Sequence, residues 1–510
     1  MKRKLLCTFF FACLGFYVKA NNVNITNISV SGGSVSFNLS WENSWNSTNN
    51  IDTLYPNNWD AVWIFVKLQS DATNLWSHQN LAQTGHSVTG GGAPLTIESQ
   101  PDSMGVFIRR TNPGHGSISN ASVTLALGAL PSGTTFNVKV FGIEMVHIPS
   151  GSFWLGDGNT AGATTSFANQ LITATTQTNG LSASALYSGS PAVPGTFPMG
   201  TNAFYTMKYE TTYEQAADFL NTLTYDQQAQ HFRSAAPNAA SNTTIFNTGA
   251  SQWTATNYLR IETPGVNNTT PAVVGVNYNG NSVFNEGDDG RDVACVSFST
   301  YNMLAYLDWT GLRPMTEMEY EKICRGTRLN GNAVASLQNE YAWGTTTIAH
   351  YWANSMTAKD SSTERYVGTV VDGRSYTMNQ NYVTAWPSGV RPARVGVFAE
   401  GATGRASSGA GFYGNMNLGD NAGEFVICIG TNGVGYTAEL GDGILDVNSM
   451  ANQTTWPAPN SNTGLGYRGG YYYCTNNNQS TVFTRVSNRA HVNTTSLDGN
   501  QYAVGVRGVR

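Results

Sequence analysis

An alternation of apolar and polar residues near the amino end limits what this chain can fold into. In the stretch VSFNLSW the apolar residues Val35, Phe37, Leu39 and Trp41 alternate with polar ones. This period of two is typical of a strand with one buried face. The runs AVWIFVKLQ and TFNVKVFGI are further strand candidates, and turns rich in Gly, Asn and Pro separate the three stretches. We therefore expect residues 21–142 to form a small antiparallel β-sandwich.

The pattern changes after residue 142, where three short helices are predicted. Each begins at a Ser or Thr that can accept a hydrogen bond from the first turn, and an apolar face follows. The 54 glycines among 510 residues indicate many turns and irregular loops between these helices. Residues 143–510 are thus expected to form an α+β domain held together by loops. The expected caps, their partners and the stop glycines are Thr212 with Gln215, Ser299 with Gly311, and Thr316 with Glu319 and Gly326.

The first twenty residues, MKRKLLCTFFFACLGFYVKA, have the features of a secretory signal. A basic start is followed by an apolar run and by a small residue, Ala20, after which cleavage is expected. A lipid anchor on Cys13 is the alternative, although the residues before it form a poor lipidation box. No later apolar stretch is long enough to span a bilayer. We expect a signal peptide at residues 1–20 and an exported protein that is secreted, periplasmic or on the cell surface.

Charge and cysteine content exclude some functions. The net charge of −5 comes with no basic patch, which argues against nucleic acid as a partner.

Export permits disulfide bonds, and four cysteines remain after residue 20. Two bridges could be drawn in three ways, and buried free thiols are the alternative. The four cysteines are Cys295, Cys324, Cys428 and Cys474.

Seven stretches, in order along residues 143–510, carry a resemblance to a known family. They are EMVHIPSGSFWLGDG, FYTMKYETTYEQAADFLN, CVSFSTYNMLAYLDWTGLRPMTEMEYEKICRG, YAWG, DNAGEFV, YRGGYYYC and the closing VGVRGVR. Together they resemble the formylglycine-generating enzyme, or sulfatase-modifying factor, domain. The resemblance implies a compact, irregular fold related to C-type lectins. The Asn-rich segment in front is similar to modules of secreted proteins from Bacteroidetes-type bacteria.

The family's catalytic pattern is incomplete in this chain. Its enzymes oxidise a substrate cysteine to formylglycine with O2 and a copper(I) ion held by two cysteines, and thiolates suit copper(I). Cys474 matches the first cysteine, whereas the place of the second falls on Thr481, after a two-residue insertion. Arg485 and Arg489 match the family's two arginines. The tryptophans and the glutamate of the GN-x-WEW box are also missing from residues 423–428. Copper is not expected, because a single thiolate ligand does not make a copper(I) site.

Two loops are candidates for calcium. The loop NYNGNSVFNEGDD has EF-hand-like oxygen spacing, and a turn of Asn and Gly without an ion is the alternative. In the loop that resembles the family's own calcium site, Asp420 fits but Ile427 stands where a glutamate is needed. The candidate ligands of the first loop are Asn277, Asn279, Asn281, Asn285 and Asp288.

The sequence favours a non-catalytic binding or surface-assembly protein with a protein or glycan ligand and cell-envelope partners. One alternative is an oxidoreductase of the family with an altered thiol site at Cys474. Another is a diversified ligand-binding protein of the C-type-lectin type, because Tyr and Asn make adaptable contacts. The candidate ligand-binding residues after the Gly-Gly turn are Tyr471, Tyr472, Tyr473, Asn476 and Asn477.

Overall fold

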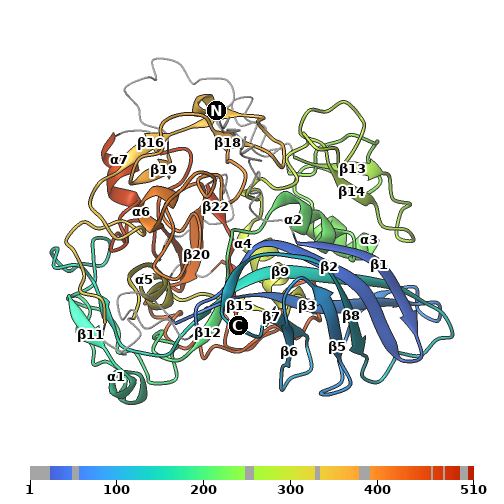
Figure 1. The fold of residues 1–510 in the computed structure, drawn as a ribbon, viewed down its shortest axis with the longest axis horizontal. Coiled ribbons are helices and arrows are strands. Elements are labelled where there is room, and N and C mark those ends of the chain that lie inside the picture. Colours follow the sequence, from blue (N-terminus) through green and yellow to red (C-terminus); the bar gives the residue numbers. More distant parts are fainter. Residues whose placement is uncertain are drawn as a thin grey trace, which may run out of the picture.

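The computed structural model shows a mixed, strand-rich protein with a few short helices among long loops (Figure 1). The signal peptide expected at residues 1–20 lies outside the residues that it describes. Among the described residues, no helix has the length and the apolar character of a membrane span. The described residues are 23–48, 57–246, 258–327, 333–377, 391–460, 463–474, 477–493 and 503–510.

The helices and strands have the following bounds. The helices are α1 (Ala174–Asn179), α2 (Tyr213–Leu220), α3 (Tyr225–His231), α4 (Thr300–Trp309), α5 (Glu317–Arg325), α6 (Arg405–Ser408) and α7 (Asn477–Phe483), with a 3-10 turn η2 (Ala353–Ser355). The strands to residue 172 are β1 (Asn24–Ser31), β2 (Ser34–Asn46), β3 (Asp60–Ser70), β4 (Trp76–Gln79), β5 (Ser87–Gly91), β6 (Leu95–Ser99), β7 (Val106–Arg110), β8 (Gly114–Ala126), β9 (Phe136–Ile148), β10 (Phe153–Leu155) and β11 (Gln170–Ile172). The later strands are β12 (Phe204–Met207), β13 (Leu259–Thr263), β14 (Val273–Val276), β15 (Arg313–Pro314), β16 (Ala349–Tyr351), β17 (Met356–Thr357), β18 (Arg365–Tyr366), β19 (Arg374–Tyr376), β20 (Gly423–Ile427), β21 (Leu465–Arg468), β22 (Val504–Gly505) and β23 (Gly508–Val509).

Two sheets face each other at the amino-terminal end of the fold. The smaller sheet has the strand order β1-β2-β8-β5, and the larger has the order β15-β23-β12-β9-β3-β7-β6 with β4 beside β3. The predicted alternation is confirmed in β2, where Phe37 and Leu39 are buried and their neighbours are half-buried. These side chains share one apolar cluster with Val62 and Ile64 of β3, so the sheets bury a common core.

The larger sheet is the middle layer of the molecule. Ile64 of β3 faces the smaller sheet, whereas Trp63 and Phe65 belong to the cluster on the opposite face. Trp63 Nε1 donates to the carbonyl oxygen of Thr310 at 2.9 Å, and the Phe65 and Trp309 ring centroids are 5.2 Å apart. The run AVWIFVKLQ is continuously apolar because the strand that it forms is buried on both faces.

Strand β9 belongs to both parts of the chain. It pairs with β3 over residues 136–146 and with β12 over residues 145–148. The boundary expected between residues 142 and 143 therefore falls inside an uninterrupted strand. Backbone pairing joins the amino-terminal sheet to the rest of the chain without a linker at this point.

A buried ion group lies at the same junction. Lys208, just after β12, has its Nζ 2.8 Å from Glu144 Oε2 and 3.6 Å from Asp60 Oδ2. The Lys208 ammonium also lies 4.8 Å from the Trp45 ring centroid. Burial raises the pKa of Asp60 to about 6, while the charge of Lys208 opposes this shift. The group links β2, β3 and β9 to the chain that follows β12.

The three predicted helices are confirmed, together with their N-caps. Helices α2 and α5 begin with a reciprocal capping box, and α4 begins at a serine cap. The chain leaves α5 at Gly326 with a φ of 88°, in the left-handed region that glycine adopts at low cost. The caps are Thr212 for α2, Ser299 for α4 and Thr316 for α5.

Candidate functional site

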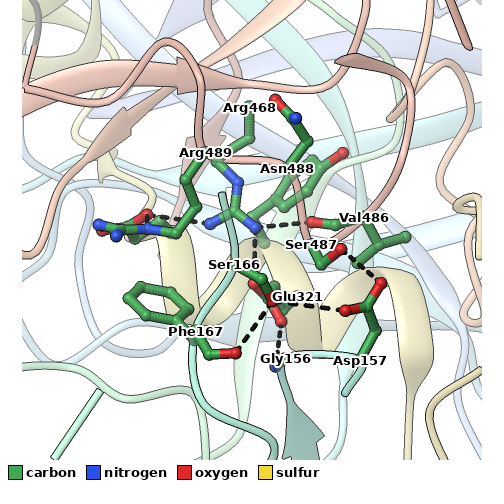
Figure 2. Close-up of polar contacts among 12 residues, drawn as sticks. Gly156, Asp157, Ser166, Phe167, Glu321, Arg468, Val486, Ser487, Asn488 and Arg489 are labelled. Carbon is green, nitrogen blue, oxygen red and sulfur yellow. Dashed lines mark hydrogen bonds and ion pairs between the residues drawn. The ribbon is translucent and has the colours of Figure 1, made fainter. Parts of the chain in front are cut away.

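Helix α5 directs carboxylates into a buried group of arginines. Glu317 accepts two hydrogen bonds from Arg489, at 2.8 and 2.9 Å, and one from Arg468 at 2.9 Å. Arg468 of β21 also donates to Glu321 at 2.6 Å and to the carbonyl oxygen of Val486. Figure 2 shows Arg468 between Glu321 and the backbone of Val486. All four charged side chains are fully buried.

The charges of this group balance. Arg325 pairs with Glu321 and with Glu340, so three carboxylates meet three guanidinium groups once Arg468 and Arg489 are included. Burial by itself raises the pKa of Glu317, but the two arginines outweigh it and hold that pKa below its usual range. Glu317 therefore stays ionised at neutral pH, and its ion pairs with Arg468 and Arg489 hold α5 against β21 and the segment after α7.

The two arginines that the family places near its catalytic centre have internal partners here. The Arg489 guanidinium donates two hydrogen bonds to Glu317 and lies 4.1 Å from the Phe167 ring centroid. Arg485 is half-buried, its backbone bridges to Tyr341, and its charge lowers the pKa of the Tyr341 phenol, which burial raises. Arg489 is thus part of the internal frame, because Glu317 balances its buried charge.

Cys474 lies beneath a group of aromatic side chains. Its thiol is fully buried, and burial raises the pKa of that thiol to about 12. Tyr467 stacks on His491 with ring centroids 4.4 Å apart, and Tyr471 and Phe483 pack around the same imidazole. A thiol in such surroundings stays protonated at neutral pH and is a weak nucleophile and a weak metal ligand.

Cys428 is directed away from Cys474. A Cβ atom at Gly466 would lie 2.8 Å from Cys428 Sγ, so Cys428 is on the Gly466 face of the β20–β21 pair. Successive side chains alternate across a strand, and Tyr467 therefore points to the opposite face. Cys474 lies near the Tyr467 phenol, whose pKa its presence raises. The β20–β21 ladder thus separates the two thiols.

All four cysteines after residue 20 are free and buried. Among the alternatives open from the sequence, the structure has free thiols rather than bridges. Burial raises the pKa of Cys295 and Cys324 to about 12 and that of Cys428 further. These thiols behave as small apolar side chains in the cores that they occupy.

Comparison with known proteins assigns the middle of the chain to a known family. Residues 137–381 match the sequence model of a family described as the Sulfatase-modifying factor enzyme 1-like domain. These residues form a domain of the sulfatase-modifying factor family. No curated protein matched the chain. The matched range contains α2, α4, α5 and all of β9 except its first residue, and it ends before the segment that carries Cys474.

The tyrosines that follow the Gly-Gly turn have different surroundings. Tyr472 is only 2% exposed and packs in an apolar cluster with Tyr376, whereas Tyr471 and Tyr473 are half-buried. Asn476 lies outside the described residues, as does the side chain of Asn477, the first residue of α7. The part of this segment that a ligand can reach without rearrangement is therefore limited to Tyr471 and Tyr473 among the three tyrosines.

The first candidate calcium loop has the side-chain oxygens of all four candidate asparagines already in use, because each accepts a backbone N–H. Three of these bonds close tight turns, whereas Asn285 reaches back nine residues to Val276. Asp288 instead joins Glu286 and Asp289, and the three offer carboxylate oxygens within 4.8 Å of one another. Calcium binding at this loop stays a prediction. The acceptor and donor pairs are Asn277 with Gly280, Asn279 with Asn281, Asn281 with Val283, and Asn285 with Val276.

Asp420, in the loop that resembles the family's calcium site, is buried with both oxygens occupied. One oxygen accepts from the backbone N–H of Tyr376 at 2.6 Å and the other from Asn417 Nδ2 at 3.0 Å. Burial raises the pKa of Asp420 to about 6. With Ile427 in place of a glutamate, these residues do not fit a calcium ion, because one donor from β19 and one from the loop itself satisfy Asp420.

The buried ion group is absent from the sequence-based predictions, which named Arg489 only as a candidate catalytic residue. Its members lie on α5, on β21 and in the segment after α7, so that Glu317 is 151 residues from Arg468 and 172 residues from Arg489. One local signal exists: EMEYEKICR contains five charged residues in nine, in a chain with only 12% charged residues. A helix so rich in charge is usually exposed, yet every residue of α5 is buried.

Proposed function

We propose that this protein is an exported, non-catalytic binding or surface-assembly protein with a protein or glycan ligand at the cell envelope. Its frame joins an amino-terminal β-sandwich module to a sulfatase-modifying factor domain of C-type-lectin-like fold. The observation that carries the proposal is the state of Cys474, which is buried, protonated at neutral pH and separated from Cys428 by a strand pair.

The residues present do not fit a copper(I) centre of the family's kind. Copper(I) prefers thiolates, and the family's site needs two of them. Here the second position is Thr481, a half-buried residue of α7 whose hydroxyl is a poor ligand for a soft ion. Arg489 is held by Glu317 rather than directed at a substrate. These contacts support a domain that has kept its internal ion pairs without the family's copper-dependent oxidation.

Oxygen uptake on a cysteine-containing peptide, with copper(I) supplied, tests the proposal. We expect the same uptake from the wild-type protein, from Cys474→Ser and from buffer with copper alone. Thr481→Cys is a useful third sample, because it returns a thiol to the family's second position. Peptide oxidation by the wild-type protein that disappears in Cys474→Ser would show an oxidoreductase and overturn the proposal.

A further inference from the structure

A lysine and two carboxyl groups lie on one face of three adjacent strands, where the amino-terminal sheets join the sulfatase-modifying factor domain. Asp60 begins β3, Glu144 lies in β9, and Lys208 directly follows β12. Glu144 is opposite Val62 in the register, two residues from Asp60, and side chains two residues apart share a face of a strand. The Lys208 backbone N–H donates to the Glu144 carbonyl oxygen at 2.9 Å, which places the lysine beside the glutamate.

The Lys208 amine lies within reach of both carboxyl groups. Its Nζ is 3.6 Å from Asp60 Oδ2 and 2.8 Å from Glu144 Oε2, and each of the three side chains is at most 4% exposed. The Trp45 and Tyr209 ring centroids lie 4.8 and 5.4 Å from the same nitrogen. An amine among aromatic rings, beside a carboxylate that can take its proton, has the surroundings of a nucleophile.

Proton balance within the group allows an uncharged state. Burial raises the pKa of Asp60 to about 6, so roughly a tenth of the molecules hold a protonated Asp60 at pH 7. Burial lowers the pKa of Lys208, but the nearby acidic groups outweigh it and hold that pKa above its usual range. Transfer of the Lys208 proton to Glu144 then leaves one amine and two carboxyl groups without buried charge. This neutral form is a minor one, which is sufficient for a reaction that occurs once in each molecule.

The Asp60 carboxyl group has the hydrogen-bond donors that an acyl substitution requires. Its Oδ1 accepts from the Trp45 backbone N–H at 2.8 Å and from the Ser44 hydroxyl at 3.0 Å. Donors in these positions stabilise negative charge that develops on Oδ1. The Trp41 indole N–H donates to Oδ2 at 3.3 Å. Glu144 Oε1 is buried without a hydrogen-bond partner among the described residues, so it is free to hold a proton.

We propose that Lys208 and Asp60 form an intramolecular isopeptide bond, with Glu144 as the acid–base group. Lys208 Nζ attacks Asp60 Cγ, and Oδ1 takes the negative charge. Glu144 accepts one proton from the nitrogen and gives one to the hydroxyl group at Oδ2, which leaves as water. The products are an amide, one water molecule and the protonated Glu144 that was present before the attack, so no oxidant or cofactor is needed. The bond ties β3 to the chain after β12 and is independent of the proposed binding function.

Mass spectrometry of denatured protein, residues 21–510, tests the proposal. We expect an intact mass lower than that of the sequence by one water molecule, and a digest in which the peptide with Asp60 is joined to the peptide with Lys208. The closed loop also makes the denatured chain more compact, so it should migrate faster in a denaturing gel. An intact mass without this loss, or a loss of water that fragmentation assigns to other residues, would overturn the proposal.

Two variants test the assigned roles. Lys208→Arg keeps a cation but has no nucleophilic amine, and we expect no joined peptides. Glu144→Gln keeps the shape but cannot exchange the protons, and its bridged fraction should be at least about tenfold lower than that of wild type prepared in parallel. Asp372→Asn, at an exposed aspartate away from the group, should keep the bond.

Thermal unfolding shows which of these variants are folded. A bridged fraction of wild-type size in Glu144→Gln would contradict the role of Glu144. If Lys208→Arg or Glu144→Gln does not fold, the mass and the joined peptides of the wild-type protein still decide whether the bond exists. None of these measurements involves Cys474, so failure of this inference is distinguishable from failure of the proposed function.

Discussion

At the scale of single residues, burial decides which groups can act. Cys474 is fully buried and Asp218 is half-buried, and in both burial favours the neutral form. For the thiol this means low reactivity. For the carboxyl it means that a proton is bound in the neutral pH range, where an exposed aspartate would be charged.

The thiols should resist modification in the native protein. In a chain that begins at residue 21, titration with Ellman's reagent at pH 8 should detect almost no reactive thiol before unfolding and all four in guanidinium chloride. The reason is the burial of each sulfur, which also raises its pKa. Rapid reaction of one native thiol that is lost in Cys474→Ser would contradict the assigned state of Cys474.

Asp218 should make stability depend on pH. Burial and the neighbouring Glu214 raise the pKa of its carboxyl to about 7, while Lys139 and Arg291 lower it. The folded state thus binds a proton that the unfolded state, with a pKa near 4, has lost, so this contribution falls as the pH rises from about 4 to 7.

Asp218→Asn removes the ionisation, and the variant should gain stability over the wild type as the pH rises. We expect a gain on the order of 1–2 kcal/mol at pH 8 and a smaller one at pH 5, measured by chemical denaturation. Asp372→Asn is the control. A gain of the same size at both pH values would show that the carboxyl is not protonated in the folded state.

At the scale of elements, the helices begin at N-caps that can be predicted from the sequence. Thr316 accepts the N–H of Glu319 and donates to the carbonyl oxygen of Pro198, so it both starts α5 and ties it to another loop. Such caps involve residues within four positions of each other, which is why they are predictable. The burial of both faces of β3 cannot be predicted in this way, because it depends on α4, which is more than 200 residues away.

Replacing Thr316 by alanine should destabilise the protein by about 1–2 kcal/mol, because it removes the cap of a fully buried helix. Thr173→Ala is a matched control: Thr173 caps α1 with the same reciprocal pair, but α1 buries none of its residues. We expect a cost below about 1 kcal/mol there. Urea denaturation measures both, and equal losses would argue that α5 has no special place in the core.

At the scale of the whole molecule, buried charge and a shared sheet hold distant segments together. Glu317 connects Arg468 and Arg489, and Lys208 connects Asp60 and Glu144. Each group joins segments that are far apart in the sequence. The removal of one partner leaves an uncompensated charge, which costs far more than the loss of a surface pair.

Glu317→Gln should destabilise the protein by about 3–5 kcal/mol, because two buried guanidinium groups lose their shared carboxylate. Glu214→Gln, at an ion pair whose side chains are 40–41% exposed, should cost less than about 1 kcal/mol. Equilibrium unfolding at pH 7 compares the two. A small effect of Glu317→Gln would show that the network adds little to stability.

A fragment of residues 143–510 should not fold independently. It lacks β3, which pairs along β9, and it loses Trp63 and Phe65 from the core that contains Trp309. We expect aggregation or a loss of cooperative thermal unfolding, compared with residues 21–510 as the control. A soluble fragment that unfolds cooperatively would show that the amino-terminal sheet is dispensable.

The sequence by itself determined the local elements and the family. The alternation in β2 and the caps of α2, α4 and α5 follow from preferences that act within a few residues, and ordered motifs carry the resemblance. The sequence also showed that Thr481 stands where a second cysteine would be needed. Each of these features can be recognised without knowing what lies beside it in space.

Only the tertiary structure decided what those residues can do. The charge on Arg489 is balanced by Glu317, 172 residues away, and the Cys474 thiol is protonated because Tyr467, Tyr471 and their neighbours exclude water. Burial and charge pairing arise from contacts between distant segments, and they set proton affinity, reactivity and access to ligands.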